Sequence, residues 1–429
     1  MPEPEPRRRG ISPTFTLFLV LFVVSIGFGL IIPILPLLTR AYGASPLALG
    51  AMTASYSVVQ FIFSPIWGQI SDRVGRKPIL MIGITGLSLS FFFMGFAHSF
   101  AGLFWARVLG GLLGSATLPS AQALAAEVTG TRNRSRAMGL MGAAFGTGFV
   151  VGPVLGGILA PFGMSVPFVV GGIFGTLTVF LAAVILREPR RRVQEGGAHA
   201  GTAQAGAGRS GSAGAVPAEG ARGLSLLRNI GIAFRGPGAP YYTLAFVIMF
   251  TQSTLMTAIA YFFTDRFGVG PETIGLVFAA NGAVGAAIQG AAIGAITERL
   301  GDRKTILLGL GAGVIGFSAL VLSPSLVFGI ASVMLLSVSM SLTRPTASSA
   351  VSKVTPLPQG VTMGIQSSCD SLGRVVGPLW AGYSYSLSQN APFLSAAVAG
   401  LLALLYIRAA TQVGAADPTS AMTDSLHTS

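Results

Sequence analysis

Residues 139–157 read GLMGAAFGTGFVVGPVLGG, an apolar, glycine-rich stretch without a charged residue. A related stretch lies 225 positions later, where residues 364–382 read GIQSSCDSLGRVVGPLWAG. Both stretches have a Gly-Pro pair at the same point and end on two small residues. A pattern repeated over this distance predicts a chain built from two related halves.

The composition indicates a membrane protein. Hydrophobic residues make up 52% of the chain and charged residues 10%, whereas soluble domains carry about 25% charged residues. The 27 basic residues against 14 acidic ones would favour a nucleic-acid partner in a soluble chain. Here the charges gather in short segments between apolar runs, so we expect no nucleic-acid partner. The single cysteine, Cys369, excludes a disulfide framework and a cysteine-based metal site.

Twelve apolar runs are long enough to cross a bilayer, which takes about 20 residues each. They cover residues 14–38, 46–70, 78–98, 101–127, 137–161, 165–186, 241–263, 272–295, 304–323, 325–350, 361–386 and 391–408. We therefore predict an all-α membrane protein with twelve transmembrane helices in two pseudo-symmetric six-helix halves. The predicted divisions are an N-terminal segment 1–13, a first half 14–187, a linker 188–240, a second half 241–409 and a tail 410–429.

The linker differs from the rest of the chain in composition. Residues 196–220 are rich in Gly, Ala and Ser, which predicts a flexible connection. Residues 224–234 are flanked by arginines and predict a short amphipathic helix on the membrane surface.

Basic residues also predict the orientation. If the N-terminus lies in the cytoplasm, the basic residues of the connecting segments fall inside, and only Arg40 and Arg266 fall outside. Because basic residues concentrate on the cytoplasmic side of membrane proteins, we expect both termini there.

Two more sites match between the halves. Residues 68–77, GQISDRVGRK, recur as residues 294–304, GAITERLGDRK, with one inserted residue. Pro119 followed by Glu127-Val-Thr has its counterpart in Pro345 followed by Lys353-Val-Thr. Six spans repeated in parallel arrangement are typical of one large class of transporters.

On these motifs the chain resembles the major facilitator superfamily over nearly its whole length. Residues 68–78 fit that superfamily's signature G-x-x-x-D-R-x-G-R-K, and Arg107 with Gly111 and Gly114 is similar to a looser motif of its fourth helix. The first two spans are similar to those of tetracycline and multidrug exporters with twelve helices. The fifth-helix pattern of the superfamily's drug:proton antiporters is matched by Gly139, Gly148, Gly152, Pro153, Gly156 and Gly157.

The fifth-helix glycines also have a purely physical interpretation. Gly148, Gly152 and Gly156 lie one turn apart on one helix face, so a neighbouring helix can approach closely. Pro153 removes a hydrogen bond and permits a kink. Tight packing alone is the alternative to an antiporter role.

The resemblance implies a charge latch that holds the cytoplasmic side closed in the outward-facing state. Asp72 would face the start of the eleventh span, and the arginines would face Glu127 at the end of the fourth. The alternative for Arg76 and Lys77 is a role as basic anchors only. The predicted latch residues are Gly68, Asp72, Arg73, Gly75, Arg76, Lys77, Glu127, Glu298 and Arg299.

Charged residues within a span cost about 2.5–3.5 kcal/mol each and therefore call for a function. Asp370 is the only carboxylate that we place well inside the bilayer, and we predict that it carries the proton. Arg374 lies one turn away, so a static Asp370–Arg374 ion pair is the alternative. The resemblance implies that Arg107 takes part in proton coupling, and an ion pair with a helix-end carbonyl is its alternative.

Polar residues on several spans predict a substrate cavity. Each single Gln or Asn could instead form an interhelical hydrogen bond, and Arg344 could lie in the cavity or near its inner end. The resemblance to tetracycline exporters implies an acidic residue in the first span. Positions 21–30 have none, which argues against tetracycline as the specific substrate. The predicted cavity residues are Tyr56, Gln60, Gln122, Gln252, Asn281, Gln289, Arg344 and Gln366.

We predict a secondary active transporter of the cell inner membrane that exports amphiphilic drugs by alternating access. Its expected partners are a small amphiphilic substrate, protons and the lipid bilayer, and we expect a monomer. The alternatives are an exporter of a metabolite or sugar, or a lipid or lysolipid translocator.

Other chemistry finds no support in the sequence. Residues 311–316 spell G-x-G-x-x-G but lie within an apolar span, so they predict no nucleotide site. No Walker sequence and no cluster of His, Asp and Glu is present. We therefore expect no enzyme, no metal and no cofactor, with the proton gradient as the energy source.

Overall fold

The computed structural model describes residues 13–186 and 231–413, apart from the side chains of residues 13–14, 126, 128–138 and 411–413. Residues 1–12 of the predicted N-terminal segment 1–13, residues 188–230 of the predicted linker and residues 414–429 of the predicted tail lie outside the described residues. So does most of the predicted surface helix 224–234, of which residues 231–234 are helical. The described residues form helices with short connections and no strand.

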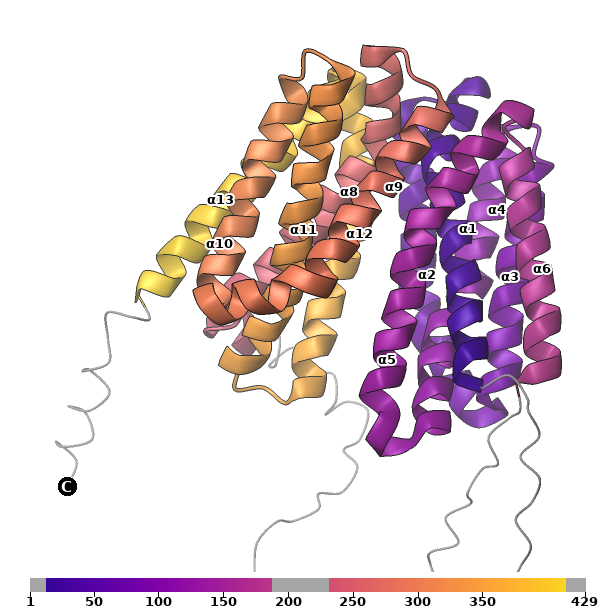
Figure 1. Ribbon diagram of the computed structural model, residues 1–429, viewed down its shortest axis with the longest axis horizontal. Coiled ribbons are helices and arrows are strands. Elements are labelled where there is room, and N and C mark those ends of the chain that lie inside the picture. The colour runs from indigo at the N-terminus through magenta and orange to yellow at the C-terminus, as the bar shows by residue number, and fades with distance from the viewer. Residues whose placement is uncertain (1–12, 187–230, 414–429) are drawn as a thin grey trace, which may run out of the picture.

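Each half holds six helices (Figure 1). The first half consists of α1 (Pro13–Ala41), α2 (Pro46–Val74), α3 (Arg76–Gly95), α4 (Phe100–Gly114), α5 (Thr117–Leu159) and α6 (Val166–Ile185). The second half consists of α8 (Ala239–Phe267), α9 (Pro271–Ala287), α10 (Ile293–Val321), α11 (Leu326–Val354), α12 (Gln359–Leu387) and α13 (Ala391–Val413). A 3-10 turn (Ala160–Phe162) follows α5, and a π-helical turn (Ile288–Ala292) joins α9 to α10.

The twelve predicted spans are confirmed within the described part of the chain. Ten helical segments there are long and apolar enough to cross a membrane, and one of them, residues 271–321, contains both α9 and α10. α12 is not among the ten, although its 29 residues are long enough. Its Asp370, Arg374 and several hydroxyl and amide side chains lower its hydropathy. It nevertheless packs between α2 and α8 as part of the bundle.

The apolar segments Phe100–Ala125 and Gly139–Phe162 match the predicted fourth and fifth spans, but the helices do not begin and end where these spans do. α4 ends at Gly114, inside the predicted fourth span, where glycines weaken the helix. The Ser115 hydroxyl there donates to the Leu112 carbonyl at 2.9 Å and competes with the backbone. α5 then continues through the segment predicted as a loop, because no proline occurs between Pro119 and Pro153 to end it.

The predicted turns at residues 68–77 and 294–304 are each a break at one glycine. α2 continues to Val74 and α3 starts at Arg76, with Gly75 between them at φ 123°. Gly301 interrupts α10 in the same way at φ 75°. These conformations favour glycine because it lacks a Cβ.

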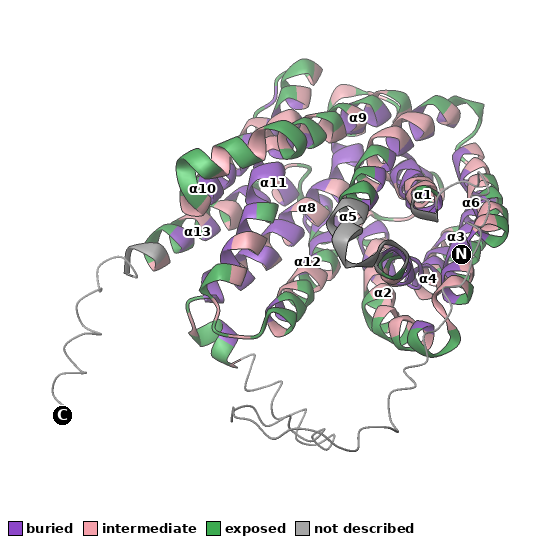
Figure 2. Cartoon of the chain, turned by 60° about the horizontal axis from the view of Figure 1, so that its bottom comes forward, coloured by how far each residue is buried: buried purple, intermediate pink, exposed green. Residues whose placement is uncertain are grey.

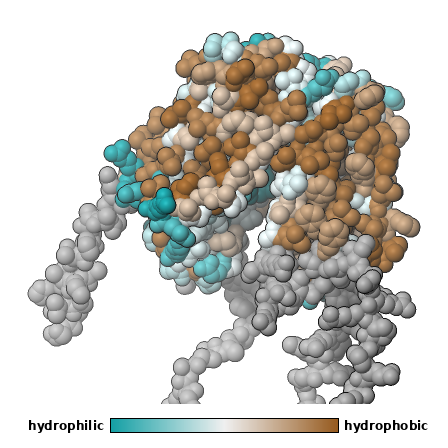
Figure 3. All heavy atoms as spheres, in the orientation of Figure 1, coloured by the Kyte–Doolittle hydropathy of each residue, from teal (hydrophilic) through white to brown (hydrophobic). Residues whose placement is uncertain are grey.

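The two ends of the bundle differ in charge. We call one the basic end, where Arg73, Arg76, Lys77, Arg303, Lys304 and Arg408 gather, and the other the far end, where the chain turns at Gly43 and Gly268. Hydrophobic residues cover the visible sides of both halves between these ends (Figure 3). Exposed residues lie along the outer face of α10, while α8 and α11 carry many buried ones (Figure 2). This distribution fits a bundle that is surrounded by lipid.

The hydrophobic core is shared between the halves only at the far end. The largest cluster of buried apolar residues joins α1 residues such as Leu38 to α8 residues such as Phe262. Toward the basic end the described core separates into three smaller clusters. One, around Leu21 and Ile84, belongs to the first half, and the two around Ile248 and Tyr242 belong to the second.

Candidate transport pathway

The halves meet at the far end through backbone contacts that occur twice. A Cβ at Gly50 of α2 would clash with the Pro378 carbonyl oxygen of α12. A Cβ at Gly275 of α9 would clash in the same way with the Pro153 carbonyl oxygen of α5. Gly275 lies 225 residues after Gly50, and Pro153 lies 225 residues before Pro378, so the duplicated chain makes one contact on each side of a pseudo-twofold axis.

A second pair of contacts follows the same symmetry. Gly382 of α12 packs against the backbone of Pro46 at the start of α2. Gly157 of α5 packs against the Pro271 carbonyl oxygen at the start of α9, where an added Cβ would lie 3.1 Å away. Because such contacts need glycine on one side, the far end is closed by direct approach of the helices.

An ion pair between equivalent positions closes the centre of this seam. Arg40 at the end of α1 donates to both carboxylate oxygens of Asp265 at the end of α8, at 2.5 and 2.9 Å. These residues are also 225 positions apart. Tyr385 of α12 donates to Asp265 at 2.7 Å, and the Arg40 guanidinium lies 5.0 Å from the centre of the Tyr261 ring. This bidentate pair joins the two halves directly.

At the basic end the helices of the two halves do not approach each other in this way. A Cβ added at any of several glycines there would meet no heavy atom within 4 Å. The halves lean together at the top of Figure 1 and stand apart below. The open glycines are Gly68, Gly139, Gly142, Gly146, Gly290, Gly294, Gly360 and Gly364.

The ion pairs found among the described residues of the basic end lie within each half. Arg76 at the start of α3 pairs with Glu127 of α5 at 2.9 Å and also with Asp72. Lys353 of α11 pairs with Asp302 of α10 at 2.6 Å. Both interhelical pairs join residues that are 51 positions apart. Asp302 and Lys353 lie 226 positions after Arg76 and Glu127, so the second half repeats the pair with the charges reversed.

The structure thus brings most of the predicted latch residues of the first half together. Arg76 contacts Glu127 as expected, and Lys77 donates to the Ala183 carbonyl of α6 at 2.7 Å. Glu298 and Arg299 are exposed on the first turns of α10. The latch function itself stays a prediction, because the two halves are apart at this end.

The antiporter-motif glycines pack α5 against α1. Gly148, Gly152 and Gly156 follow one another along α1, from Ser25 through Gly29 to Pro33. The Pro153 ring would touch a Cβ at Gly29. In the second half Gly373 and Gly377 pack against α8 in the equivalent way. Gly139 takes no part, since the space around it is open.

A cavity of about 410 Å³ is lined by residues of the second half, on α8, the π-helical turn, α11 and α12. Four predicted cavity residues, Gln252, Gln289, Arg344 and Gln366, line it together with Asp370, the predicted proton carrier. The remaining lining residues are Met340, Pro345, Ser348, Met363 and Ser367.

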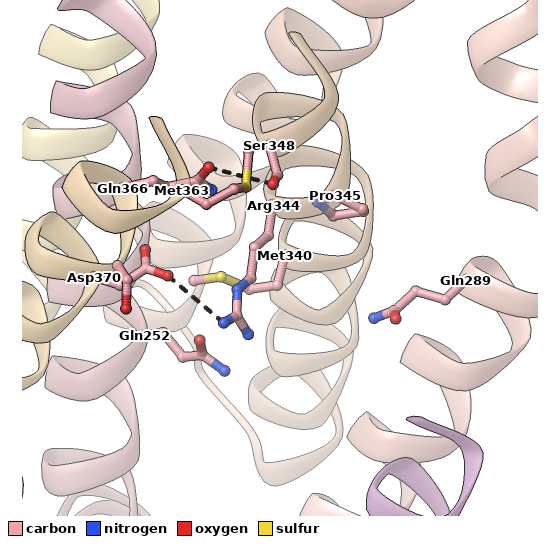
Figure 4. Close-up of a pocket in the computed structure, with 10 residues that line it drawn as sticks. Gln252, Gln289, Met340, Arg344, Pro345, Ser348, Met363, Gln366 and Asp370 are labelled. Carbon is pink, nitrogen blue, oxygen red and sulfur yellow. Dashed lines mark hydrogen bonds and ion pairs between the residues drawn. The ribbon is translucent and has the colours of Figure 1, made fainter. Parts of the chain in front are cut away.

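Asp370 faces Arg344 across this cavity (Figure 4). The closest oxygen–nitrogen distance is 3.8 Å, which is an ion pair but too long for a hydrogen bond. The Asp370 side chain is 13% exposed and that of Arg344 53%. The expected partner Arg374 lies within electrostatic range of both, but no Asp370–Arg374 ion pair within 4.0 Å is found. The structure therefore pairs Asp370 with α11 and not along its own helix.

Arg107 lies apart from this cavity. Its guanidinium stacks 4.3 Å from the centre of the Tyr56 ring, and its Nε has no hydrogen-bond partner. Both residues border a crevice of about 10 Å³ in the first half, the lower limit for one water molecule. Arg107 therefore does not form the helix-end ion pair that is its alternative interpretation.

The other predicted cavity residues are scattered. Gln60 is half-buried on α2, and Gln122 is exposed on α5. The carbonyl oxygen of Asn281 accepts a hydrogen bond from Ser337 at 2.6 Å, which ties α9 to α11. None of the three lines the cavity of about 410 Å³.

Sequence reasoning missed the ion pairs Arg40–Asp265 and Asp302–Lys353. A signal existed in both cases. Arg40 and Asp265 lie at the same offset as the repeated motifs and carry opposite charges. Asp302 and Lys353 lie at that offset from Arg76 and Glu127, which also carry opposite charges. Among the described residues no group of three or more His, Cys, Asp or Glu is arranged to hold a metal.

Comparisons with known proteins agree with this geometry. The family model described as Major Facilitator Superfamily matches residues 17–238 and 241–423. Multidrug resistance protein 1 of Bacillus subtilis (strain 168) is 30% identical over 400 residues, covering 90% of this chain and 93% of that protein. The class G tetracycline resistance protein of Vibrio anguillarum is 30% identical over 386 residues, covering 89% and 92% of the two chains.

Solved structures share the fold. A bacterial homologue of the human lysosomal transporter Spinster, in an inward-facing and unoccupied conformation, superposes with a TM-score of 0.71 at 18% identity. That match covers 93% of this chain and 96% of the other. The human organic anion transporter MFSD10 superposes with a TM-score of 0.63 at 24% identity, covering 94% and 100%.

Proposed function

Because the chain belongs to the major facilitator superfamily, we propose that it exports amphiphilic drugs in exchange for protons by alternating access. It is a multi-pass membrane transporter and not an enzyme. The similarity to proteins named for multidrug and tetracycline resistance supports drugs as the cargo.

The basic end faces the cytoplasm of the cell in this proposal. The concentration of Arg and Lys at that end supports the assignment. Both termini then lie in the cytoplasm, and the membrane is the inner membrane of a bacterium. The far end is closed and the basic end open, so the conformation is inward-facing.

Asp370 carries the proton, and the observation that supports this most is its place in the cavity. It is the only described carboxylate away from the two ends of the bundle, and it lines the cavity beside a partner 3.8 Å away. A carboxylate held this loosely can lose its arginine when it takes up a proton or when a substrate arrives.

One chain contains the whole pathway, so the working unit is a monomer. The proton gradient supplies the energy, and no cofactor takes part. Efflux of a metabolite, sugar or lysolipid on the same fold is the competing function, which the experiment below distinguishes.

The test is drug-dependent proton flux in everted membrane vesicles. Drugs are added to energised vesicles that contain the wild-type protein, and the collapse of the pH gradient is followed. We expect Asp370→Asn to reduce this flux to the level of vesicles without the protein. Glu272→Gln, an exposed acid at the far end, removes the same charge and should leave the flux unchanged.

Two results would contradict the proposal. Full proton flux in the Asp370→Asn protein would exclude Asp370 as the carrier. Proton flux that is driven by sugars or lysolipids but by no drug would show that the substrate is not a drug, while the fold stays as described.

A further inference from the structure

Charged side chains in the middle of the bundle are mostly basic. Among the described residues of the spans, those away from both ends are Arg107, Arg344, Arg374 and Asp370. Arginine stays protonated in proteins. Even when Asp370 is ionised, the described middle of the bundle therefore carries three positive charges and one negative charge.

Arg107 has no anionic partner. It is 9% exposed, and no described carboxylate lies within 4.0 Å of it. The Tyr56 ring compensates part of the cost of burying the charge. The charge of Arg107 is therefore buried in the first half without a carboxylate contact among the described residues.

Arg374 lies on α12, one helical turn after Asp370. It lies within electrostatic range of Tyr56 on α2 of the first half, and of Arg344 and Asp370 in its own half. Its side chain is exposed, and no described residue forms an ion pair with it. Arg344 lines the cavity, and Arg374 lies within electrostatic range of it without being a lining residue. An anion that reaches both guanidinium groups would stabilise these two like charges.

An anion alone does not fit proton exchange through Asp370. An anion bound to Arg344 would take the partner of Asp370 and favour the protonated carboxyl. Anion and proton would then bind together, because such coupling is reciprocal. Exchange requires that the substrate and the proton exclude each other. A basic group of the substrate achieves this when it binds the Asp370 carboxylate in place of the proton.

The rest of the cavity suits an apolar body of moderate size. Met340 and Met363 line it with flexible side chains that adapt to different shapes. Gln252, Gln289 and Gln366 supply neutral hydrogen-bonding groups. A volume of about 410 Å³ lies within the range of small-molecule sites.

From these observations we infer that the substrate is a zwitterionic amphiphile. Its acidic group binds Arg344 and Arg374, its basic group binds Asp370, and its apolar body lies against the two methionines. This inference rests on the proposed exchange of drug for proton.

The experiment uses Nε-dansyl-lysine and three derivatives of it with the purified protein. The methyl ester keeps only the positive charge, the Nα-acetyl compound keeps only the negative charge, and the doubly modified compound is neutral. Binding is measured by dansyl fluorescence, and proton release by a pH dye in weak buffer. We expect the zwitterion to bind about tenfold or more tightly than each derivative and to release protons as it binds.

Variants locate the acidic group. Arg374→Gln should weaken the zwitterion about tenfold and leave the methyl ester unchanged, whereas Arg374→Lys should keep part of the preference. Arg235→Gln, an exposed arginine at the basic end, is the matched control and should change nothing. Thermal unfolding of each variant shows whether it is folded.

The outcomes separate this inference from the proposed function. Equal binding of zwitterion and ester, equal binding of zwitterion and acetyl compound, or no binding of any of the four overturns the inference. Drugs that drive proton flux through the wild-type protein without such a preference leave the proposed function in place. Proton exchange that survives Asp370→Asn removes the proposed proton carrier, whatever the ligand preference.

Discussion

The far end and the basic end of the bundle are built from the same duplicated motifs but connect the halves differently. At the far end the ion pair Arg40–Asp265 crosses between the halves, and glycines let the backbones touch. At the basic end Arg76–Glu127 and Lys353–Asp302 each stay within one half. The described ion pair of the far end therefore joins the two halves, whereas those of the basic end connect helices within one half.

The largest effect is expected from filling the far-end contact. Gly50→Ala places a Cβ against the Pro378 carbonyl oxygen, and overpacking of this kind costs about 1–3 kcal/mol. Because the cost falls on the closed far end, we expect the far end to open about tenfold more often and transport to fall accordingly. The measurement is the labelling rate of a cysteine that replaces Ala381, which is 1% exposed, by an impermeant maleimide in a Cys369→Ser background.

Gly311→Ala is the control for this prediction. An added Cβ at Gly311 would lie 3.9 Å from Leu404, which is ordinary contact within one half. An unchanged labelling rate in Gly50→Ala would show that the contact does not hold the far end closed.

A smaller effect is expected from the ion pair that crosses the axis. Arg40→Asp and Asp265→Arg each place like charges together and should raise the labelling rate of the same cysteine. The double variant should recover part of the closed state, with a coupling energy of about 0.5–3 kcal/mol. Recovery is partial because Tyr385 and Tyr261, which contact the native pair, both belong to the second half. If the free-energy changes of the two single variants simply add in the double variant, direct coupling between Arg40 and Asp265 is excluded.

The smallest effect is expected at the basic end. Lys353→Ala removes a pair whose lysine side chain is 62% exposed, and such pairs contribute about 0.2–1 kcal/mol. We expect a slightly lower unfolding temperature and no change in the labelling of the far-end cysteine. Labelling as fast as in Arg40→Asp would mean that this pair also holds the halves together.

Much of the fold could be predicted because the signals are local. Each span needs only a run of apolar residues, and the duplication is visible as an offset of 225 or 226 positions. The fourth and fifth spans were predicted correctly. The break between α4 and α5 and the continuation of α5 between the two spans were not, because ordinary residues without proline do not mark where a helix continues. The span 361–386 was predicted as an apolar run, and α12 covers it although its polar residues leave it outside the ten most apolar helical segments.

The candidate site could be predicted only in part. Asp370 stood out because a carboxylate inside a span is rare, and four of the predicted cavity residues line the same cavity. Its partner Arg344 lies on another helix, so no spacing along the chain could identify it. The separation of Arg107 from this cavity likewise depends on how the two halves lie against each other.

The sequence by itself determined that this protein is a twelve-span bundle of two related halves, because hydropathy and internal repeats act within single helices. It also determined which residues carry charge inside the membrane. Only the tertiary structure decided which end is closed and which charges meet, because those depend on contacts between residues such as Arg40 and Asp265 that lie 225 positions apart. Contacts between two similar halves can form at either end. The free-energy difference between the state closed at the far end and the state closed at the basic end does not depend on any local sequence pattern.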